Sequence, residues 1–362
     1  MNKKRIVVAM SGGVDSTTVA ALLKKEGHEV IGITMQILDY GDAEGGCCSL
    51  DQVVDARRGA DQIGIPHYVV NFTEEFENLV LTDYVEKYRS GKTPIPCVLC
   101  NQHVKFDLLM KRALELGAEY LATGHYARIE KGNGNALTLK RACDESKDQT
   151  YFLYTLTQKE LGRLMFPLGA LTKDEVRELA REMNLRQADK PDSTGVCFVP
   201  TGNYRDFLVS RGAFTEREGE IINTEGVVLG SHKGVFSFTL GQRRGLGIAT
   251  GRPMYVTEIE PDTNRVIVGE EDKIYGTKLL AENLTWINST YIAGRLENKV
   301  KVKAKIRYRH SASDAFVTIN KETGALVEFE NPQRAITPGQ AVVFYDEDEV
   351  LGGGWIKEVL KS

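Results

Sequence analysis

The sequence predicts a doubly wound α/β domain followed by two small all-β modules, the last of them a β-barrel. The first half alternates short apolar runs with helical stretches, which is typical of a parallel sheet covered by helices. From about Gly219 onward the helical periodicity stops, and strand-like runs are separated by Gly, Asn-Thr and Pro-Asp turns. A chain of 362 residues also exceeds what one core usually supports. We therefore expect three domains, at residues 1–200, 201–275 and 276–362.

The elements of the first domain follow from local patterns. Its expected strands are short buried runs at Arg5–Met10, Glu29–Met35, His67–Phe72 and Tyr120–Thr123. Its expected helices are Ser16–Glu26, Asp51–Ile63, Glu74–Arg89, Phe106–Leu116 and Val176–Met183. Gly27 ends the first helix, and Thr172 and Glu175 have the spacing of a capping box before the last one.

Composition argues against several classes of protein. No segment has the apolar length of a membrane span, and Met1–Arg5 leads into a strand without the apolar core of a signal peptide. We therefore expect a cytoplasmic protein with no membrane partner. The net charge of -4 excludes a globally basic nucleic-acid coat, so RNA binding would need a local basic patch. Without an export signal, the six cysteines are expected to be thiols, metal ligands or catalysts rather than structural disulfides.

A candidate phosphate-binding loop, AMSGGVDSTTVA, follows the first strand and opens the first helix. Gly12 and Gly13 let the backbone approach an anion, the helix N-terminus offers unpaired N–H groups, and Ser11 and Ser16 add hydroxyl donors. Asp15 beside phosphates requires Mg²⁺ to turn repulsion into bridging. No lysine follows the glycines, which disfavours transfer of a γ-phosphoryl group. The alternative is an ordinary Gly-rich turn with Ser or Asp as a helix cap.

Two cysteines three residues apart, Cys97 and Cys100, raise the question of a metal site. The chain has no second pair of this kind, which argues against structural zinc on four thiolates and leaves a redox dithiol open. Cys197, in the stretch DSTGVCFV, is a third candidate. For Cys143 we expect ordinary burial, and for the adjacent pair Cys47–Cys48, in a Gly-rich loop, burial is favoured over redox activity.

Seven motifs extend the pattern through most of the chain. They are MSGGVDS, TPIPCVLCN, KFD, TGHYAR, KDQTYFL, GVCFV and FTLGQRRGLG. In order and approximate spacing they resemble the bacterial tRNA-specific 2-thiouridylase family of the PP-loop ATP pyrophosphatase superfamily. The resemblance implies a PP-loop catalytic domain that uses ATP to adenylate the oxygen at C2 of the wobble uridine in tRNAs for Lys, Glu and Gln. Sulfur then attacks the activated carbon, and AMP leaves.

The resemblance assigns roles to individual residues. It implies that Cys197 receives sulfur as a persulfide and that Cys100 acts with it, releasing sulfur while a disulfide forms between the two. The sulfur would come from a sulfur-carrier protein or a cysteine desulfurase. Implied ATP contacts are Ala9, Met10, Ser11, Gly12, Gly13, Val14, Asp15, Ser16, Met35 and Gly124. Implied tRNA contacts are Ile95, Pro96, Cys97, His125, Lys147, Asp148, Gln149, Arg307, Tyr308 and Gln340. From the residues alone, core burial explains Met35 and a structural role explains His125.

Cys97 departs from the family pattern, because many members have Asp at this position and use the carboxylate as an acid or base. Two interpretations stay open. Cys97, Cys100 and Cys197 can hold a [4Fe-4S] cluster by three corners, with one iron left to bind hydrosulfide. Alternatively, the enzyme follows the persulfide route, and Cys97 is a spare or proton-relaying thiol.

A basic stretch near the C-terminus is the candidate RNA surface. In NKVKVKAKIRYRH the alternating basic residues are Lys299, Lys301, Lys303, Lys305, Arg307 and Arg309. On one strand all six would share a face, where their repulsion would be relieved by a polyanion. The alternative is an edge strand guarded by lysines. A second basic cluster lies at Gly241–Gly245.

Two other functions compete with tRNA thiolation. Another adenylating enzyme of the superfamily, such as an amidotransferase or ligase, would need neither the basic stretch nor Cys197. An RNA-binding metal–cysteine redox sensor would bind tRNA without consuming ATP.

Overall fold

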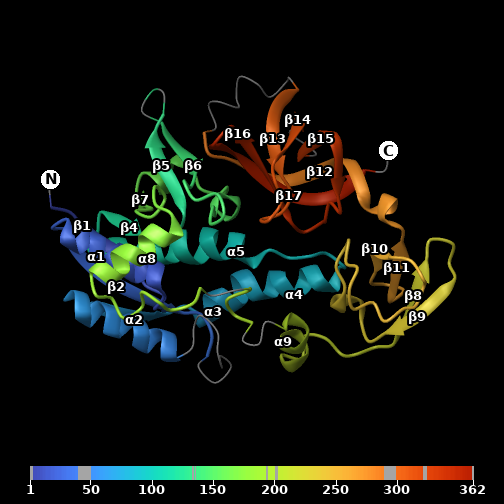
Figure 1. Ribbon diagram of the computed structural model, residues 1–362, viewed down its shortest axis with the longest axis horizontal. Helices are drawn as coiled ribbons and strands as arrows, with labels where there is room; N and C mark the ends of the chain where they lie inside the picture. Colours follow the sequence, from blue (N-terminus) through green and yellow to red (C-terminus); the bar gives the residue numbers. More distant parts are fainter. Residues whose placement is uncertain are drawn as a thin grey trace.

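The computed structural model describes residues 3–39, 50–132, 134, 136–192, 195–199, 203–288, 299–320 and 324–360. Its N-terminal part, on the left of Figure 1, is a parallel sheet. The sheet has five strands in the order β3-β2-β1-β4-β7. The strands are β1 (Arg5–Ala9), β2 (Glu29–Gln36), β3 (His67–Asn71), β4 (Tyr120–Ala122) and β7 (Leu164–Met165). Four of them match the expected strands, and β7 was not expected. Cys47 and Cys48 lie outside the described residues.

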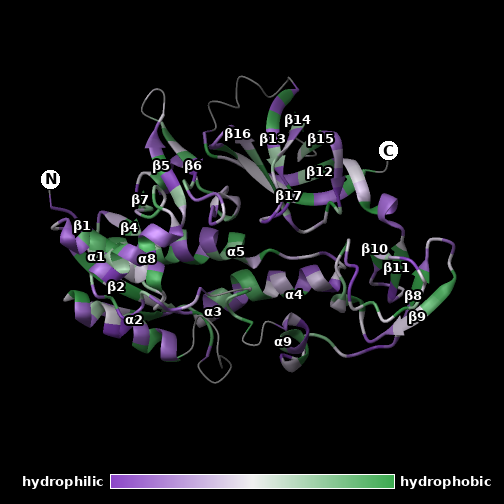
Figure 2. Ribbon diagram, in the orientation of Figure 1, coloured by the Kyte–Doolittle hydropathy of each residue, from purple (hydrophilic) through white to green (hydrophobic). Residues whose placement is uncertain are grey.

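Both faces of this sheet are buried, as expected for a doubly wound domain. Alternate strand residues point into two different core clusters: Val7, Ile31 and Ile33 into one, and Ile6, Val8 and Val30 into the other. Figure 2 shows β2 in hydrophobic colours and the helix α2 (Leu50–Ile63) with hydrophilic and hydrophobic residues interleaved. The helices α1 (Val14–Lys25) and α8 (Lys173–Glu182) also belong to this domain. The expected capping box is present, since Thr172 and Glu175 each accept from the other's backbone.

Two expected helices differ from the structure in length or regularity. Residues Thr73–Arg89 form one helix whose middle is π-helical: α3 (Thr73–Phe76), η1 (Glu77–Leu81) and α4 (Thr82–Arg89). The helix expected at Phe106–Leu116 starts ten residues earlier, as α5 (Pro96–Leu99), η2 (Cys100–Leu109) and α6 (Met110–Glu115). Pro96 occupies its first turn, where a missing N–H costs nothing. Both Cys97 and Cys100 therefore lie on a helix rather than in a loop.

The remaining elements of the N-terminal half are short. They are the hairpin β5 (Ala127–Lys131) and β6 (Leu137–Arg141), the 3₁₀ turn η4 (Thr150–Phe152), α7 (Gln158–Leu161) and, further along the chain, α9 (Tyr204–Ser210). Cys143, which was expected to be buried, is exposed. That expectation was wrong because the residue follows the end of β6, where the chain turns over the surface.

The central module is a four-stranded sheet in the order β10-β11-β8-β9. Its strands are β8 (Gly219–Asn223), β9 (Val228–His232), β10 (Tyr255–Glu260) and β11 (Arg265–Gly269), with 3₁₀ turns η5 (Val235–Ser237) and η6 (Glu271–Ile274). Its core contains the fully buried Ile221, Val256, Val266 and Val268.

The C-terminal module is a closed β-barrel, as expected. Six strands follow the order β12-β15-β14-β13-β16-β17, and β12 pairs with β17 to close the ring. They are β12 (Tyr275–Trp286), β13 (Val300–Lys305), β14 (Ser313–Asn320), β15 (Gly324–Arg334), β16 (Ala341–Asp346) and β17 (Glu349–Leu360). The hairpin β5–β6 extends this sheet, since Glu349 and Val350 pair with Lys140 and Leu139. Figure 1 shows the hairpin reaching from the first domain beside the barrel.

One hydrophobic core joins the first domain to the barrel. It includes Tyr151 and Tyr154 from the first domain and Ala341, Val343 and Tyr345 from β16. The Tyr151 hydroxyl donates to the Ala341 carbonyl at 2.8 Å. Among the helices of the described residues, none is both long enough and apolar enough to span a bilayer.

Candidate functional site

The candidate phosphate loop lies between the end of β1 at Ala9 and the start of α1 at Val14. Gly12 has φ +74°, and a Cβ there would lie 2.4 Å from the Gln52 carbonyl oxygen of α2, so only glycine fits. Gly13 is the N-cap of α1 and supplies no side-chain cap. The Ser16 hydroxyl accepts from the Ser11 N–H at 3.1 Å and closes the loop on itself. The loop therefore presents backbone at a helix N-terminus, the arrangement that binds phosphate.

Gly124, far away in the sequence, lies against this loop. A Cβ at Gly124 would be 3.0 Å from the Asp15 Cβ and 3.1 Å from the Ser16 nitrogen. Met35 lies near the end of the neighbouring strand β2, half-buried against the core. Met10 is buried, and its carbonyl accepts from the Thr34 hydroxyl at 2.7 Å. The carboxyl edge of the sheet thus brings Ala9–Ser16 and Gly124 together and places Met35 on the adjacent strand.

Lysines from distant segments supply positive charge that the loop itself lacks. The Lys173 ammonium, on a side chain only 10% exposed, lies 2.8 Å from Asp15 and 2.8 Å from Asp192. The Tyr126 hydroxyl also donates to Asp15, at 2.8 Å. The Lys190 ammonium donates to the Gly12 carbonyl at 3.1 Å. Sequence reasoning missed both lysines because nothing local links them to the loop.

Asp192 is the centre of the same ion-pair network. Lys147 and Arg177 contact its carboxylate at 2.8 and 3.0 Å, in addition to Lys173. Burial opposes ionisation of Asp192, yet the hydrogen bonds from Lys147 and Lys173 lower its pKa to about 2. The carboxylate is therefore charged across the physiological range.

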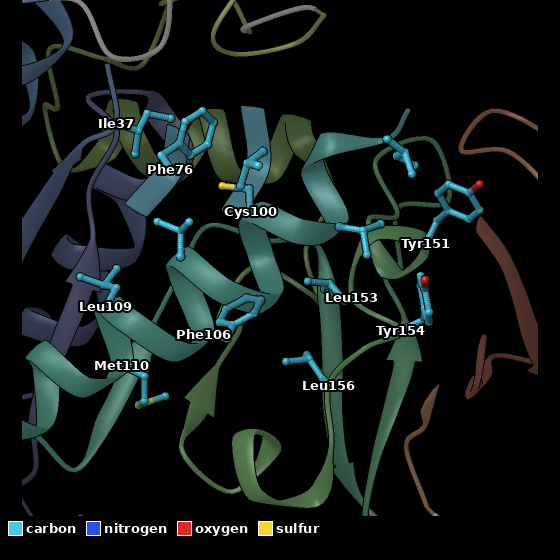
Figure 3. Close-up of a cluster of buried hydrophobic side chains, with 14 of the residues drawn as sticks. Ile37, Phe76, Cys100, Phe106, Leu109, Met110, Tyr151, Leu153, Tyr154 and Leu156 are labelled. Atoms are coloured by element: carbon cyan, nitrogen blue, oxygen red, sulfur yellow. The ribbon is translucent and has the colours of Figure 1, made fainter. Parts of the chain in front are cut away.

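Both candidate catalytic cysteines belong to one large core cluster. Cys100 is 7% exposed, and Figure 3 shows its side chain among apolar neighbours, with its sulfur pointing toward the side of Phe76. Burial raises the pKa of the Cys100 thiol, against the opposing effect of Lys105. Cys197 is part-exposed and packs against the same cluster. Its neighbour Phe198 is buried, with ring centroids 5.4 and 5.2 Å from those of Phe76 and Tyr84.

Cys97 lies one helical turn before Cys100 and is part-exposed. Tyr308, in a turn of the barrel, packs part-buried against the same core cluster as Cys197, and burial raises its pKa.

The described part of the chain does not fit the [4Fe-4S] cluster, one of the two interpretations left open by the sequence. A metal centre requires its ligands to converge, and in the described part of the chain no three His, Cys, Asp or Glu side chains do so. Cys100, one of the three expected ligands, is instead buried among hydrophobic side chains.

Several residues expected to contact tRNA have protein partners, either at the start of the helix that carries Cys97 and Cys100 or within the barrel. Ile95 and Pro96 are buried at its start. The Gln340 amide donates to the Thr93 and Pro94 carbonyls at 3.0 and 3.1 Å. The half-buried Arg307 donates to the Ala335 carbonyl and to the Thr337 hydroxyl.

A second set of expected tRNA contacts lies near Tyr126. Lys147 pairs with Asp192. The side-chain oxygen of Gln149 accepts a hydrogen bond from the Tyr126 backbone N–H at 3.0 Å. Asp148 is 4% exposed and caps the Thr150 turn through its carboxylate. His125 is buried, its Nδ1 is 2.7 Å from the Thr123 hydroxyl, and burial and Lys105 lower its pKa well below the ordinary value. His125 is therefore neutral at physiological pH and has the contacts of a structural residue.

The expectation of six basic side chains on one strand face was wrong. β13 ends at Lys305, and Arg307 and Arg309 lie in the following bend and turn. Carboxylates of neighbouring strands pair with the first three lysines: Lys299 with Glu328 at 2.6 Å, Lys301 with Glu330 at 3.3 Å and Lys303 with Asp314 at 3.2 Å. Lys305 is 9% exposed. Cross-strand pairs therefore relieve the repulsion that suggested a polyanion.

Three domain profiles match consecutive parts of the chain. Residues 4–201 match the profile described as a tRNA methyl transferase HUP domain, residues 205–270 the tRNA methyl transferase PRC-barrel domain, and residues 276–356 the aminomethyltransferase beta-barrel domain. Among solved structures, a 4-thiouridine synthetase–RNA complex with bound ATP has a TM-score of 0.35 and 21% identity, over 57% of this chain and 50% of that one. That likeness is too low to bear on function.

Curated proteins are far more similar. A tRNA-specific 2-thiouridylase MnmA of Geobacter metallireducens is 53% identical over 98% of this chain and 97% of its own length. A protein of the same name from Carboxydothermus hydrogenoformans is 49% identical over 99% of each chain. With this identity along the full length, and with the glycine loop and cysteine helix in place, the chain belongs to the tRNA-specific 2-thiouridylase family.

Proposed function

We propose that the protein is an ATP-dependent tRNA sulfurtransferase that converts the wobble uridine of tRNAs for Lys, Glu and Gln to 2-thiouridine in the cytoplasm. The observation that carries the proposal is that one domain holds both a phosphate loop at the sheet edge and two cysteines, the buried Cys100 and the part-exposed Cys197, on a core shared with the barrel. Residues 1–200 perform catalysis, residues 201–275 form the central module, and residues 276–362 form the tRNA-binding barrel.

In the first step the uridine O2 attacks the α-phosphorus of ATP, and pyrophosphate leaves. The N–H groups at the start of α1 bind phosphate oxygens, and the helix dipole favours their charge. Asp15, 31% exposed at the loop, is the carboxylate that would hold Mg²⁺, which usually binds through one or two carboxylates plus substrate phosphates, and its bonds to Lys173 and Tyr126 would have to rearrange to admit the ion. When bound, Mg²⁺ neutralises phosphate charge, and Lys173 and Lys190 lie close enough to the loop to add to that effect.

In the second step sulfur replaces the activated oxygen. Cys197 carries the sulfur as a persulfide, delivered by a persulfide-bearing carrier protein or cysteine desulfurase. The Cys100 thiolate attacks the Sγ of Cys197, so hydrosulfide leaves and a Cys100–Cys197 disulfide forms. Hydrosulfide then attacks C2 of the adenylated uridine, and AMP leaves. A thiol reductant must supply two electrons to restore both cysteines before the next turnover.

The test separates the two steps in variants of the full chain. Cys100→Ser should keep tRNA-dependent pyrophosphate release but form no 2-thiouridine, because only the sulfur step needs the thiol. Cys143→Ser, at an exposed cysteine outside the core, is the matched control and should retain both activities. Thiolation by Cys100→Ser at the wild-type rate would refute the assigned role. Pyrophosphate release without tRNA would refute the proposed substrate.

A further inference from the structure

A barrel loop is hydrogen-bonded to the segment that leads into the helix carrying Cys97 and Cys100. The Gln340 amide nitrogen donates to both the Thr93 and Pro94 carbonyls, at 3.0 and 3.1 Å. In the other direction, the Thr93 N–H donates to the Pro338 carbonyl at 3.1 Å. Gly339, with φ +89°, lets the two backbones approach, since a Cβ there would lie 3.0 Å from the Thr93 oxygen. Two chain segments almost 250 residues apart in sequence are thus joined by three hydrogen bonds.

The barrel end of this connection is fixed. The Gly339 N–H donates to the Ile356 carbonyl at 2.9 Å, and the Ile356 N–H donates to the Gln340 carbonyl at 2.8 Å. The next residue, Ala341, accepts from the buried Tyr151 hydroxyl. The Gln340 side chain therefore projects from a backbone bonded to β17 and to the shared core, and this backbone restricts the position of its amide.

A second connection reaches the other side of the cysteine pair. The Tyr308 ring packs on Phe152, with ring centroids 4.4 Å apart. The Phe152 carbonyl accepts from the Asn101 side-chain amide at 3.1 Å, and the Lys105 ammonium donates to the Asn101 oxygen at 2.9 Å. Asn101 is 2% exposed and directly follows Cys100. The barrel thus contacts residues before Cys97 directly and is linked through Phe152 to Asn101, after Cys100.

We propose that Gln340 is a positioning residue for Cys100: from the barrel it fixes residues 93–94 and, through them, the start of the helix that carries the nucleophile. This inference rests on the proposed function and adds to it, because it gives the barrel a part in the sulfur step besides RNA binding. The Gln340 amide donates to two carbonyls of the chain itself. A residue that serves only as an RNA contact would not need them.

The two roles of Gln340 predict different kinetics. Gln340→Met keeps the side-chain length and removes the donor. As a positioning residue, its loss should lower kcat for 2-thiouridine formation about tenfold, because a small misplacement of a reacting group costs one to two orders of magnitude. The tRNA Kd, from filter binding, should change by less than about twofold, and tRNA-dependent pyrophosphate release should persist. Gln333→Met is the control, since Gln333 contacts only barrel partners, Ser313 and Asn331, in the described hydrogen bonds.

A second measurement does not depend on thiolation. In RNA-free protein, iodoacetamide should alkylate Cys100 at least about threefold faster in Gln340→Met and Gln340→Glu than in wild type, because the loosened segment opens the buried thiol. Mass spectrometry of the Cys100 peptide gives the rate, and Gln333→Met should match wild type. Unchanged alkylation together with a raised tRNA Kd and an unchanged kcat would overturn the inference and leave an RNA contact. A wild-type protein that forms no 2-thiouridine would refute the proposed function, while alkylation would still test the positioning role.

Discussion

The two adjacent glycines of the phosphate loop should respond very differently to one added methyl group. Gly12 has a left-handed backbone, and a Cβ there would lie 2.4 Å from the Gln52 oxygen and 3.1 Å from the Ala56 nitrogen, both in α2. Gly13 has φ -90°, an ordinary conformation, and a Cβ would meet only the Ser11 hydroxyl, at 3.5 Å. The same substitution is therefore strained at the first position and allowed at the second.

The structure sets the size of the effect. A left-handed non-glycine residue costs about 1–2 kcal/mol. Relieving the overlap with α2 backbone costs about 1–3 kcal/mol more, as overpacking does elsewhere. Gly12→Ala should thus be destabilised by at least about 2 kcal/mol, which lowers Tm by at least about 4 °C in a domain of this size. Gly12→Ala should also weaken ATP binding, because the added methyl group pushes the phosphate loop and α2 apart and so displaces the loop.

Thermal unfolding followed by circular dichroism measures the difference. Gly13→Ala is the matched control and should unfold within about 2 °C of wild type, since its backbone suits alanine. Equal Tm values for Gly12→Ala and Gly13→Ala would refute the reasoning, because the loop would then have room or freedom that its geometry denies.

Three further predictions follow from the site. Gly124→Ala should weaken ATP binding about tenfold, since its Cβ would lie 3.0 Å from the Asp15 Cβ; an unchanged affinity in calorimetry would contradict that placement. Lys173→Met should lower the free energy of unfolding by about 1–3 kcal/mol and slow pyrophosphate release, because Asp15 and Asp192 lose their shared partner. A wild-type free energy of unfolding in a denaturant titration would show that these pairs contribute nothing to stability. Because burial raises the pKa of the Cys100 thiol, its alkylation should keep rising with pH above about 8.5; a plateau at lower pH would be inconsistent.

The parts of the fold that depend on local patterns were predictable. The strand-turn-helix context of Gly12 and Gly13 and the capping box at Thr172 need only residues a few positions apart, and both are present in the structure. Four of the five sheet strands were also found, because buried runs of β-branched residues leave a clear signal.

The features that were missed depend on partners far away in the chain. The hairpin β5–β6 has weak alternation of its own and is stabilised by pairing with β17, about 210 residues later. Lys173 reaches Asp15 across 158 positions, and no local pattern signals such a pair. The lysines of β13 looked like an unpaired basic face only because Glu328, Glu330 and Asp314 come from other strands.

The cysteine question shows the same division. Spacing alone placed Cys97 and Cys100 close together and argued against structural zinc, but it left a cluster and exchange chemistry open. The burial of Cys100 in the shared core is a property of the assembled fold, and no spacing in the sequence predicts it.

The most direct test of the central claim is mass spectrometry of the wobble nucleoside after incubation of the purified protein with ATP, Mg²⁺, a persulfide donor and unmodified tRNA for Lys. The account predicts 2-thiouridine with about one AMP released per nucleoside modified, as adenylation of each uridine requires. It also predicts that no AMP forms when tRNA is left out. AMP released in the absence of tRNA, or an unmodified wobble uridine in the complete reaction, would contradict it.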